Sequence, residues 1–249
     1  MRIYSATVVR ILGQLRRDRR SVFMIVAVPA VLTILLYYVL SLQPRGLDGR
    51  RPFDRLAVIQ LGVLPCAVMF AITAICMRRE RANGTLERIF TTPLTKLQLL
   101  AGYSTAFSLA AMAQATVVTV VAFELLHLHT QGSPLLVFAI AILDAILGVT
   151  LGLFFSAFAR SEFQAVQFTP IVLIPQLFVC GLLVPRNRMP GWLHTISNGL
   201  PLPYAVDALQ EVSVHPGTTW TMWHSVIVVA LFAIGAVFAG ASTLRRTAD

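Results

Sequence analysis

The sequence has little charge and almost no lysine. Charged residues make up 12% of its 249 positions, where a soluble domain has about 25%. The only lysine is Lys96, and no G-x-x-x-x-G-K-[S/T] pattern occurs, so this chain has no P-loop for ATP. The three cysteines, Cys66, Cys76 and Cys180, form no C-x-x-C pair. They lie in apolar sequence, where we expect small buried side chains rather than metal or redox chemistry.

What the chain has in excess is hydrophobic sequence, at 57% of its residues. A helix needs about 20 mostly apolar residues to cross the ~30 Å hydrocarbon core of a bilayer. Because lipid offers the backbone no hydrogen-bond partners, such stretches must be helical. The sequence therefore predicts an all-α integral membrane protein. Its six predicted transmembrane helices are Val22–Leu42, Leu56–Met77, Ala101–Glu124, Leu135–Phe158, Ala165–Val184 and Met222–Thr243.

The basic residues predict the orientation of these helices. Fourteen of the twenty Lys and Arg lie before the first stretch, between the second and third, or after the fourth and sixth. The positive-inside rule places these segments, and both termini, in the cytoplasm. The basic residues behind the net charge of +9 thus lie mainly in the loops of one side, and this distribution does not indicate nucleic-acid binding. The first outer loop is an exception, with Arg45, Arg50, Arg51 and Arg55. The preference for Arg over Lys suggests a bacterial protein, which places the chain in the plasma (inner) membrane.

We expect one domain over residues 1–249, with a bundle at 22–243 and a cytoplasmic tail at 244–249. In residues 1–21, Tyr4, Val8, Ile11 and Leu15 recur at helical spacing among arginines. This pattern predicts an amphipathic helix on the cytoplasmic membrane surface. The alternative is a simple positively charged anchor.

The loop at residues 78–100 contains turn and helix-start signals, which are typical of a structured segment. Asn83-Gly84 is a turn signal, and Thr85 can cap a short helix over Leu86–Phe90. Thr92-Pro93 is a second start signal, which predicts a new helix that runs into the third span. A short helix held between two spans on the cytoplasmic face can transmit force, so we interpret it as a coupling helix.

Seven of the thirteen prolines fall between residues 170 and 216. Pro170 and Pro175 should kink or break the fifth span. The sequence after Val184 is too apolar for an ordinary loop, and we predict short re-entrant helices at the outer surface, covered by protein or a cavity.

Three polar residues lie near the middle of predicted spans: Gln114, Asp144 and Gln176. A carboxylate at that depth costs at least ~2.5 kcal/mol, so Asp144 should face the protein interior. These residues are candidates for a substrate pathway or a proton-linked site. The alternative is structural, with Asp144 hydrogen-bonded to a neighbouring helix, for example through Gln114.

Two further patterns favour structural roles. Gly148, Gly152 and Ser156 form a small-xxx-small face, which we expect to pack within one subunit. His127-x-His129 lies in a short outer loop without further metal ligands nearby in sequence, so we predict solvated or interfacial histidines and no metal site.

The loop at 78–100 resembles that of the type-2 ATP-binding-cassette (ABC) export permeases of the drug-resistance and nodulation type. Their R-E-x-x-x-G-T-L-E-x-[L/I]-x-x-T-P-L pattern stands here as Arg79-Glu80, Gly84–Ile89 and Thr92–Leu94. A second family-like stretch is carried by Phe178, Gly181, Pro185, Met189, Pro190, Trp192, Leu193, Pro201, Tyr204, Asp207 and Leu209. The sequence departs from the family at 200–203, where Leu-Pro-Leu-Pro replaces the commoner Asn-Pro-Leu-Thr.

The resemblance implies a dimer of six-span units, either a homodimer or a pair with a sister permease, and two cytoplasmic ABC ATPase subunits. ATP and Mg would be bound by the ATPases, so this chain would bind no cofactor and catalyse no reaction. The N-terminal helix and the coupling segment would dock on the ATPases. That segment comprises Gly84, Thr85, Leu86, Glu87, Arg88, Ile89 and Phe90. The export direction comes from the resemblance alone.

The function that we predict is a permease subunit that exports an amphipathic drug-like or lipid-like molecule. One alternative is a permease for glycans or lipid-linked polymers on the same scaffold. Another is an ion- or proton-coupled carrier that uses Asp144. An intramembrane hydrolase that pairs Asp144 with His127 or His129 is disfavoured, because mid-depth and the outer surface are roughly 14 Å apart along the membrane normal.

Overall fold

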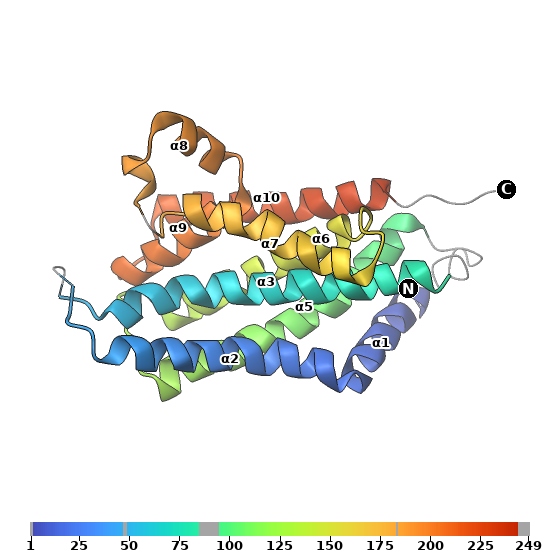
Figure 1. Ribbon diagram of the computed structural model, residues 1–249, viewed down its shortest axis with the longest axis horizontal. Coiled ribbons are helices and arrows are strands. Elements are labelled where there is room, and N and C mark those ends of the chain that lie inside the picture. Colours follow the sequence, from blue (N-terminus) through green and yellow to red (C-terminus); the bar gives the residue numbers. More distant parts are fainter. Residues whose placement is uncertain (1, 47–48, 85–94, 183, 244–249) are drawn as a thin grey trace.

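The computed structural model describes residues 2–46, 49–84, 95–182 and 184–243. This part of the chain is helical and contains no strand (Figure 1). The helices are α1 (Arg2–Arg17), α2 (Arg19–Ser41), α3 (Pro52–Ala82), α5 (Lys96–Val120), the π-turn η1 (Val121–Leu125), α6 (Pro134–Phe155), α7 (Glu162–Val179), the 3₁₀ turn η2 (Arg186–Arg188), α8 (Gly191–Asn198), α9 (Pro201–Val214) and α10 (Trp220–Ser242). The predicted all-α class is confirmed.

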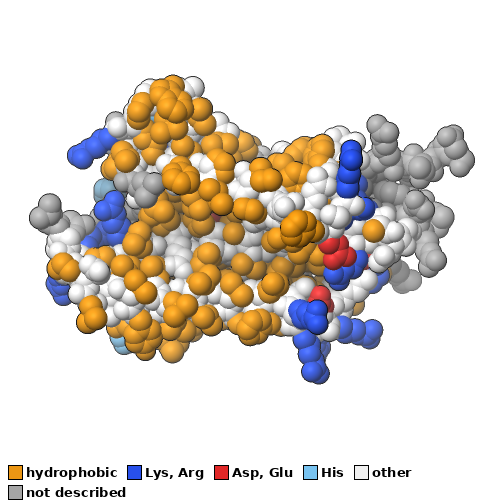
Figure 2. Space-filling view, in the orientation of Figure 1, with side chains coloured by type: hydrophobic (Ala, Val, Ile, Leu, Met, Phe, Trp, Pro, Cys, Tyr) orange, Lys and Arg blue, Asp and Glu red, His pale blue; other side chains and the backbone are white. Residues whose placement is uncertain are grey.

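Five helices in the described residues have the length and apolar composition to cross a membrane: α2, α3, α5 continued by η1, α6 and α10. Figure 2 shows hydrophobic side chains between charged side chains at the two ends of the molecule, as a bilayer requires.

The fifth predicted span, Ala165–Val184, is shorter in the structure than in the prediction. This segment is α7, which has 18 residues, ends at Val179 and is not among the five. At 1.5 Å per residue, α7 extends about 27 Å, near the lower limit of length for a membrane-spanning helix. Its first turns also carry polar residues, including Glu162 and Gln164. α7 continues through Pro170 and Pro175, so these prolines do not break the helix.

The centre of the bundle is the contact between α3 and α6, which is the most extensive between any two described helices. The backbones approach most closely at two glycines of α6. A Cβ placed on Gly148 would lie 2.2 Å from the Cys66 carbonyl oxygen, and one on Gly152 would lie 2.5 Å from that of Phe70. Ser156 is fully buried on the same helix. The predicted small-residue face therefore packs within one subunit, as expected.

α1 lies at an angle to α2 at one end of the bundle (Figure 1). Its Ile11 and Leu15 are buried in a cluster with Tyr103 and Phe107 of α5, whereas Arg16 and Arg17 are exposed. The predicted amphipathic helix is therefore confirmed. α1 ends at Arg17 and α2 begins at Arg19, so the helical span starts three residues before the predicted Val22.

Helix ends flank the predicted coupling loop. α3 ends with Asn83 as its C-cap, and Gly84 has φ = +66°, a left-handed conformation that suits glycine. The predicted Asn83-Gly84 turn is therefore confirmed. α5 begins at Lys96, where Thr95 and Gln98 form a capping box. The predicted start at Thr92-Pro93 and the predicted helix Leu86–Phe90 lie outside the described residues, as does the tail at 244–249.

After α7 the chain turns at Gly181, which has φ = +88°. The short helices α8 and α9 follow, as predicted. α8 stands away from the bundle at the end opposite α1 (Figure 1). α9 returns into it and is buried against α10, α3 and α6. Protein thus covers the backbone of α9, which is the condition for such a segment at membrane depth.

Candidate functional site

Asp144 lies inside the bundle on α6. Its side chain is fully buried, with the Cys66 thiol of α3 beside its carboxyl group, and within the described residues neither carboxyl oxygen makes a hydrogen bond of good geometry. Across the helix contact it faces Gly62 of α3, where an added Cβ would lie 3.0 Å from Asp144 Oδ2 and 2.6 Å from Leu209 of α9. The interior position is as predicted. A buried group without a partner is rare and calls for an explanation other than packing.

Gln114 of α5 is also fully buried, and neither atom of its amide has a partner in the described residues. The predicted hydrogen bond between Asp144 and Gln114 is therefore not formed. Thr73 of α3 has a buried, unpartnered hydroxyl as well. Asp144, Gln114 and Thr73 are thus fully buried side chains with polar atoms that make no hydrogen bond in the described part of the chain.

Gln176 of α7 has a different environment. Its Nε2 donates to the Val172 carbonyl oxygen (2.9 Å), and its Oε1 accepts from the Leu202 backbone N–H (3.1 Å). α9 begins at Pro201 after Leu200, which cannot cap the helix with its side chain. Gln176 therefore supplies from another helix the acceptor that the first turn of α9 lacks.

Beside Gln176, an apolar groove of about 520 Å³ opens between four helices. Gln176 is its polar residue, and the other lining residues come from α6, α7, the start of α9 and α10. They include Phe154, Phe155, Val172, Pro201, Phe232 and Gly235. Pockets of this size and character take drug-sized apolar ligands. Of the three predicted pathway residues, the structure places Gln176 in this groove and buries Gln114 and Asp144 away from it.

At the α1 end, Arg10 joins three helices. Its Nη1 lies 3.3 Å from Glu80 Oε1 of α3, and its Nη2 donates to the hydroxyl of Tyr103 of α5 at 2.7 Å. Arg79 of α3 forms a two-pronged ion pair with Glu162 of α7 at 2.9 and 3.0 Å. The guanidinium of Arg79 lowers the pKa of the Glu162 carboxyl through this hydrogen bond.

These contacts surround the base of the predicted coupling segment. Arg79 and Glu80 precede Gly84 by one helical turn, and Arg78 also donates to the Arg160 carbonyl oxygen, at 2.7 Å. The end of α3 is thereby fixed to both α1 and α7. Gly84 itself is described; Thr85, Leu86, Glu87, Arg88, Ile89 and Phe90 lie outside the described residues.

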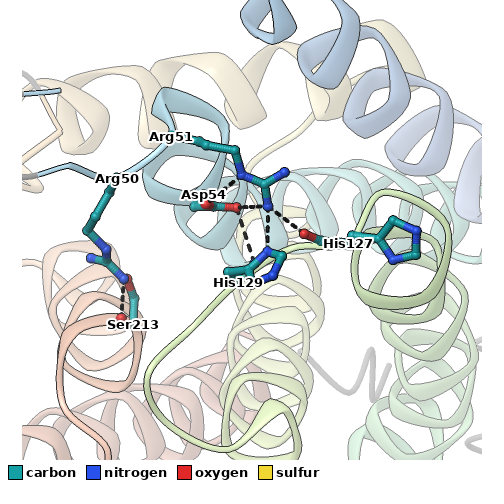
Figure 3. Close-up of polar contacts among 6 residues, drawn as sticks. All are labelled: Arg50, Arg51, Asp54, His127, His129 and Ser213. Atoms are coloured by element: carbon teal, nitrogen blue, oxygen red, sulfur yellow. Dashed lines mark hydrogen bonds and ion pairs between the residues drawn. The ribbon is translucent and has the colours of Figure 1, made fainter. Parts of the chain in front are cut away.

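At the other end, Arg51 holds the start of α3 to the loop after η1 (Figure 3). It makes a two-pronged contact with Asp54, both distances being 2.9 Å, and donates to the His127 carbonyl oxygen at 2.6 Å. Its Nη2 also lies 2.6 Å from Nδ1 of His129, and Arg50 donates to the Ser213 carbonyl oxygen. Two arginines of the loop that the sequence predicts to be outer, Arg50 and Arg51, are therefore used in structural contacts.

His127 and His129 are both exposed, which agrees with the prediction of solvated or interfacial histidines. His127 has φ = +49°, and its carbonyl oxygen, rather than its ring, faces Arg51. No group of three or more His, Cys, Asp or Glu in the described residues could hold a metal ion. The sequence interpretation missed Asp54, although an acid in the first turn of a helix, three residues after Arg51, is a recognisable signal.

The outer half-helix motif is organised around Arg186, which the sequence interpretation also missed. Arg186 pairs with Asp207 and lies 4.9 Å from the centre of the Tyr204 ring. It also donates to Asn198 Oδ1 at 2.6 Å, and the Tyr204 hydroxyl donates to the Asn198 carbonyl oxygen at 3.0 Å.

The other predicted motif residues lie at the ends of short helices or on α8. Pro190 precedes α8, and Pro201 is the first residue of α9. Met189 is the C-cap of η2, and Trp192 is exposed on α8. Tyr204 and Asp207 are the motif residues that the structure brings together through Arg186.

Comparison with known proteins agrees with this architecture. The family model described as "ABC-2 type transporter" matches residues 4–214. ABC transporter G family member 20 of Dictyostelium discoideum is 28% identical over 178 residues, or 68% of this chain and 24% of that protein. "Probable multidrug ABC transporter permease YbhR" of Escherichia coli (strain K12) is 24% identical over 154 residues, covering 62% of this chain and 42% of that protein.

A third relative, "Inner membrane transport permease YhhJ" of Escherichia coli (strain K12), is 25% identical over 176 residues. The match covers 70% of this chain and 46% of that protein. This chain therefore spans between about a quarter and a half of the length of these curated relatives.

Proposed function

Because this chain belongs to the ABC-2 type transporter family, we propose that it is the permease subunit of an ATP-driven exporter. It forms the membrane pathway for an amphipathic drug-like or lipid-like molecule. The chain has no P-loop, so ATP and Mg²⁺ bind to a separate cytoplasmic ABC ATPase subunit. A second permease subunit completes the pathway. The protein lies in the plasma (inner) membrane of a bacterium, with both termini in the cytoplasm.

The observation that carries the proposal is that the C-terminal end of α3, just before the coupling segment, is held to neighbouring helices. Arg10 connects Glu80 to α1 and α5, and Arg79 connects to Glu162 of α7. A push on residues 84–90 from an ATPase would therefore reach four helices through short ionic contacts. This arrangement supports a mechanism in which closure of the ATPases switches the pathway from inward to outward access.

The apolar groove supports the substrate class. It offers aromatic and aliphatic walls with Gln176 as its polar residue, which suits a hydrophobic body with a polar group. A strongly charged or sugar-rich polymer would find few hydrogen-bonding partners there. Names of the relatives that contain "multidrug" agree with this class.

The coupling test uses the full complex with its ATPase subunit, reconstituted in vesicles with a fluorescent amphipathic dye. Glu87→Arg, or deletion of Gly84–Phe90, should abolish ATP-driven dye transport while ATP hydrolysis and membrane insertion persist. Arg45→Glu, at the opposite end of the bundle, is the matched control. Unchanged transport in the coupling variants, or transport by the purified chain without any ATPase, would contradict the proposal.

A second candidate function is a proton-coupled carrier, which the unpartnered carboxyl of Asp144 favours. In such a carrier, Asp144 binds and releases the coupling proton as its surroundings alternate. Dye transport driven by a pH gradient in the absence of ATPase and ATP, and lost in Asp144→Asn, would establish this mechanism over the first.

A further inference from the structure

We propose that the corner between α1 and α2 binds the phosphate groups of anionic phospholipids. Four arginines flank Asp18 at this corner: Arg16, Arg17, Arg19 and Arg20. All four are exposed, and their side chains have no hydrogen-bond or ion-pair partner in the described part of the chain. Figure 2 shows basic side chains that project from the lower right of the molecule, where α1 and α2 meet in Figure 1.

The acid at the centre of the corner does not neutralise it. Asp18 is the N-cap of α2, and its carboxylate accepts from the backbone N–H groups of Arg20 (3.2 Å) and Ser21 (3.3 Å) and from the Ser21 hydroxyl (2.8 Å). Through these hydrogen bonds, the carboxylate caps the N-terminus of α2. The four arginine side chains carry four positive charges, and the carboxylate of Asp18 supplies one negative charge that is already hydrogen-bonded to the start of α2. The corner therefore has a strong positive potential that faces solvent.

The neighbouring acidic side chains form ion pairs with other arginines. Glu80 pairs with Arg10, and Glu162 pairs with Arg79. The nearby charges therefore form balanced pairs within the bundle, whereas the four corner arginines remain available to an external anion.

The position of the corner identifies that anion as a lipid headgroup. The span α2 begins at Arg19, and its first residues after the arginines, Val22, Phe23 and Met24, are exposed large hydrophobics. Apolar side chains that face outward here contact acyl chains, so the arginines immediately before them lie at headgroup depth. Clusters of four to eight basic residues beside a transmembrane helix attract anionic lipids by ~1 kcal/mol for each residue, or about fivefold in association.

The test reconstitutes the full chain in vesicles of phosphatidylcholine with added phosphatidylglycerol. Phe23→Trp provides a fluorophore at the corner after Trp192, Trp220 and Trp223 are replaced by Phe. Brominated phosphatidylglycerol should quench this fluorophore several-fold more strongly than brominated phosphatidylcholine, and high salt should reduce the difference. Arg19→Gln with Arg20→Gln should bring the ratio of the two quenching efficiencies close to one. Arg16 and Arg17 remain in this variant to maintain the orientation of the chain in the bilayer.

The matched control is Arg45→Gln with Arg55→Gln, which removes two exposed arginines from the other end and should leave the preference unchanged. Equal quenching by both lipids in the parent protein, or an unchanged preference in the corner variant, would overturn the proposal. So would loss of the preference on adding millimolar inorganic phosphate, which would assign the corner to a free anion. Shielding of the fluorophore from both lipids in the complex with the ATPase would instead identify a protein contact.

Discussion

Gly148 of α6 lies directly against the backbone of Cys66 in α3, with room for a hydrogen but not for a methyl group. A Cβ at residue 148 would stand 2.2 Å from the Cys66 carbonyl oxygen and 2.9 Å from its Cα. Because the obstacle is backbone rather than a flexible side chain, relief requires the two helices to separate. This contact is therefore the tightest constraint on how α3 and α6 pack.

Gly148→Ala should accordingly destabilise the bundle by ~1–3 kcal/mol, the usual cost of overpacking. Gly235→Ala is the matched control on α10, since nothing lies within 4 Å of an added Cβ there. It should be neutral or slightly stabilising, because alanine favours helix over glycine. Thermal unfolding in detergent measures both variants. Equal stability of the two would contradict the packing found between α3 and α6.

Asp144→Asn should alter the rate or the substrate range of transport more than it alters folding. The buried carboxyl makes no hydrogen bond of good geometry that an amide would lose, and the substitution nearly preserves its shape. Dye efflux and the amount of folded protein on size-exclusion chromatography separate the two effects. Gln114→Leu is a useful comparison, because removing an unpartnered buried amide should be neutral or stabilising. Failure of Asp144→Asn to accumulate would mean that Asp144 is structural.

Gln176→Leu should destabilise the junction of α7 and α9 by ~1–3 kcal/mol, because it leaves the buried Leu202 N–H without an acceptor. Gln167→Leu, at an exposed position of the same helix, is the control. Faster amide hydrogen exchange at Leu202 in Gln176→Leu would report the lost bond directly. Identical exchange in Gln176→Leu and the parent protein would show that Gln176 does not hold the start of α9.

Asp18→Ala should destabilise the start of α2 by ~1 kcal/mol, whereas Asp18→Asn should retain most of the cap. The Ser21 hydrogen bond and the backbone bonds lower the pKa of Asp18 from its ordinary value of 3.8. A lowered pKa in the folded state means that the ionised carboxylate stabilises the protein above pH 3.8, and that this contribution is lost as the pH falls through the lowered value. Thermal unfolding against pH should show this loss in the parent and not in Asp18→Ala.

The sequence alone identified the helical membrane architecture, because long apolar stretches admit no other backbone structure in lipid. It also identified the amphipathic α1, the turn at Asn83-Gly84, the small-residue face of α6 and the helices after α7, since each depends on residues close together in the chain. The fifth span was drawn too long, because apolar sequence continues past Gly181, where the backbone turns.

Only the tertiary structure decided which polar groups have partners. Gln114, Asp144 and Gln176 look alike in the sequence, each a polar residue in an apolar run. The fold gives Gln176 the N–H of Leu202 and gives Asp144 and Gln114 no partner. It likewise brings Arg186 to Asp207, Arg51 to His127 and Arg10 to Tyr103. Hydrophobicity is a property of each segment and can be summed along the chain. A hydrogen bond between helices depends on their rotation and register, and these are fixed by close contacts such as that of Gly148 with Cys66.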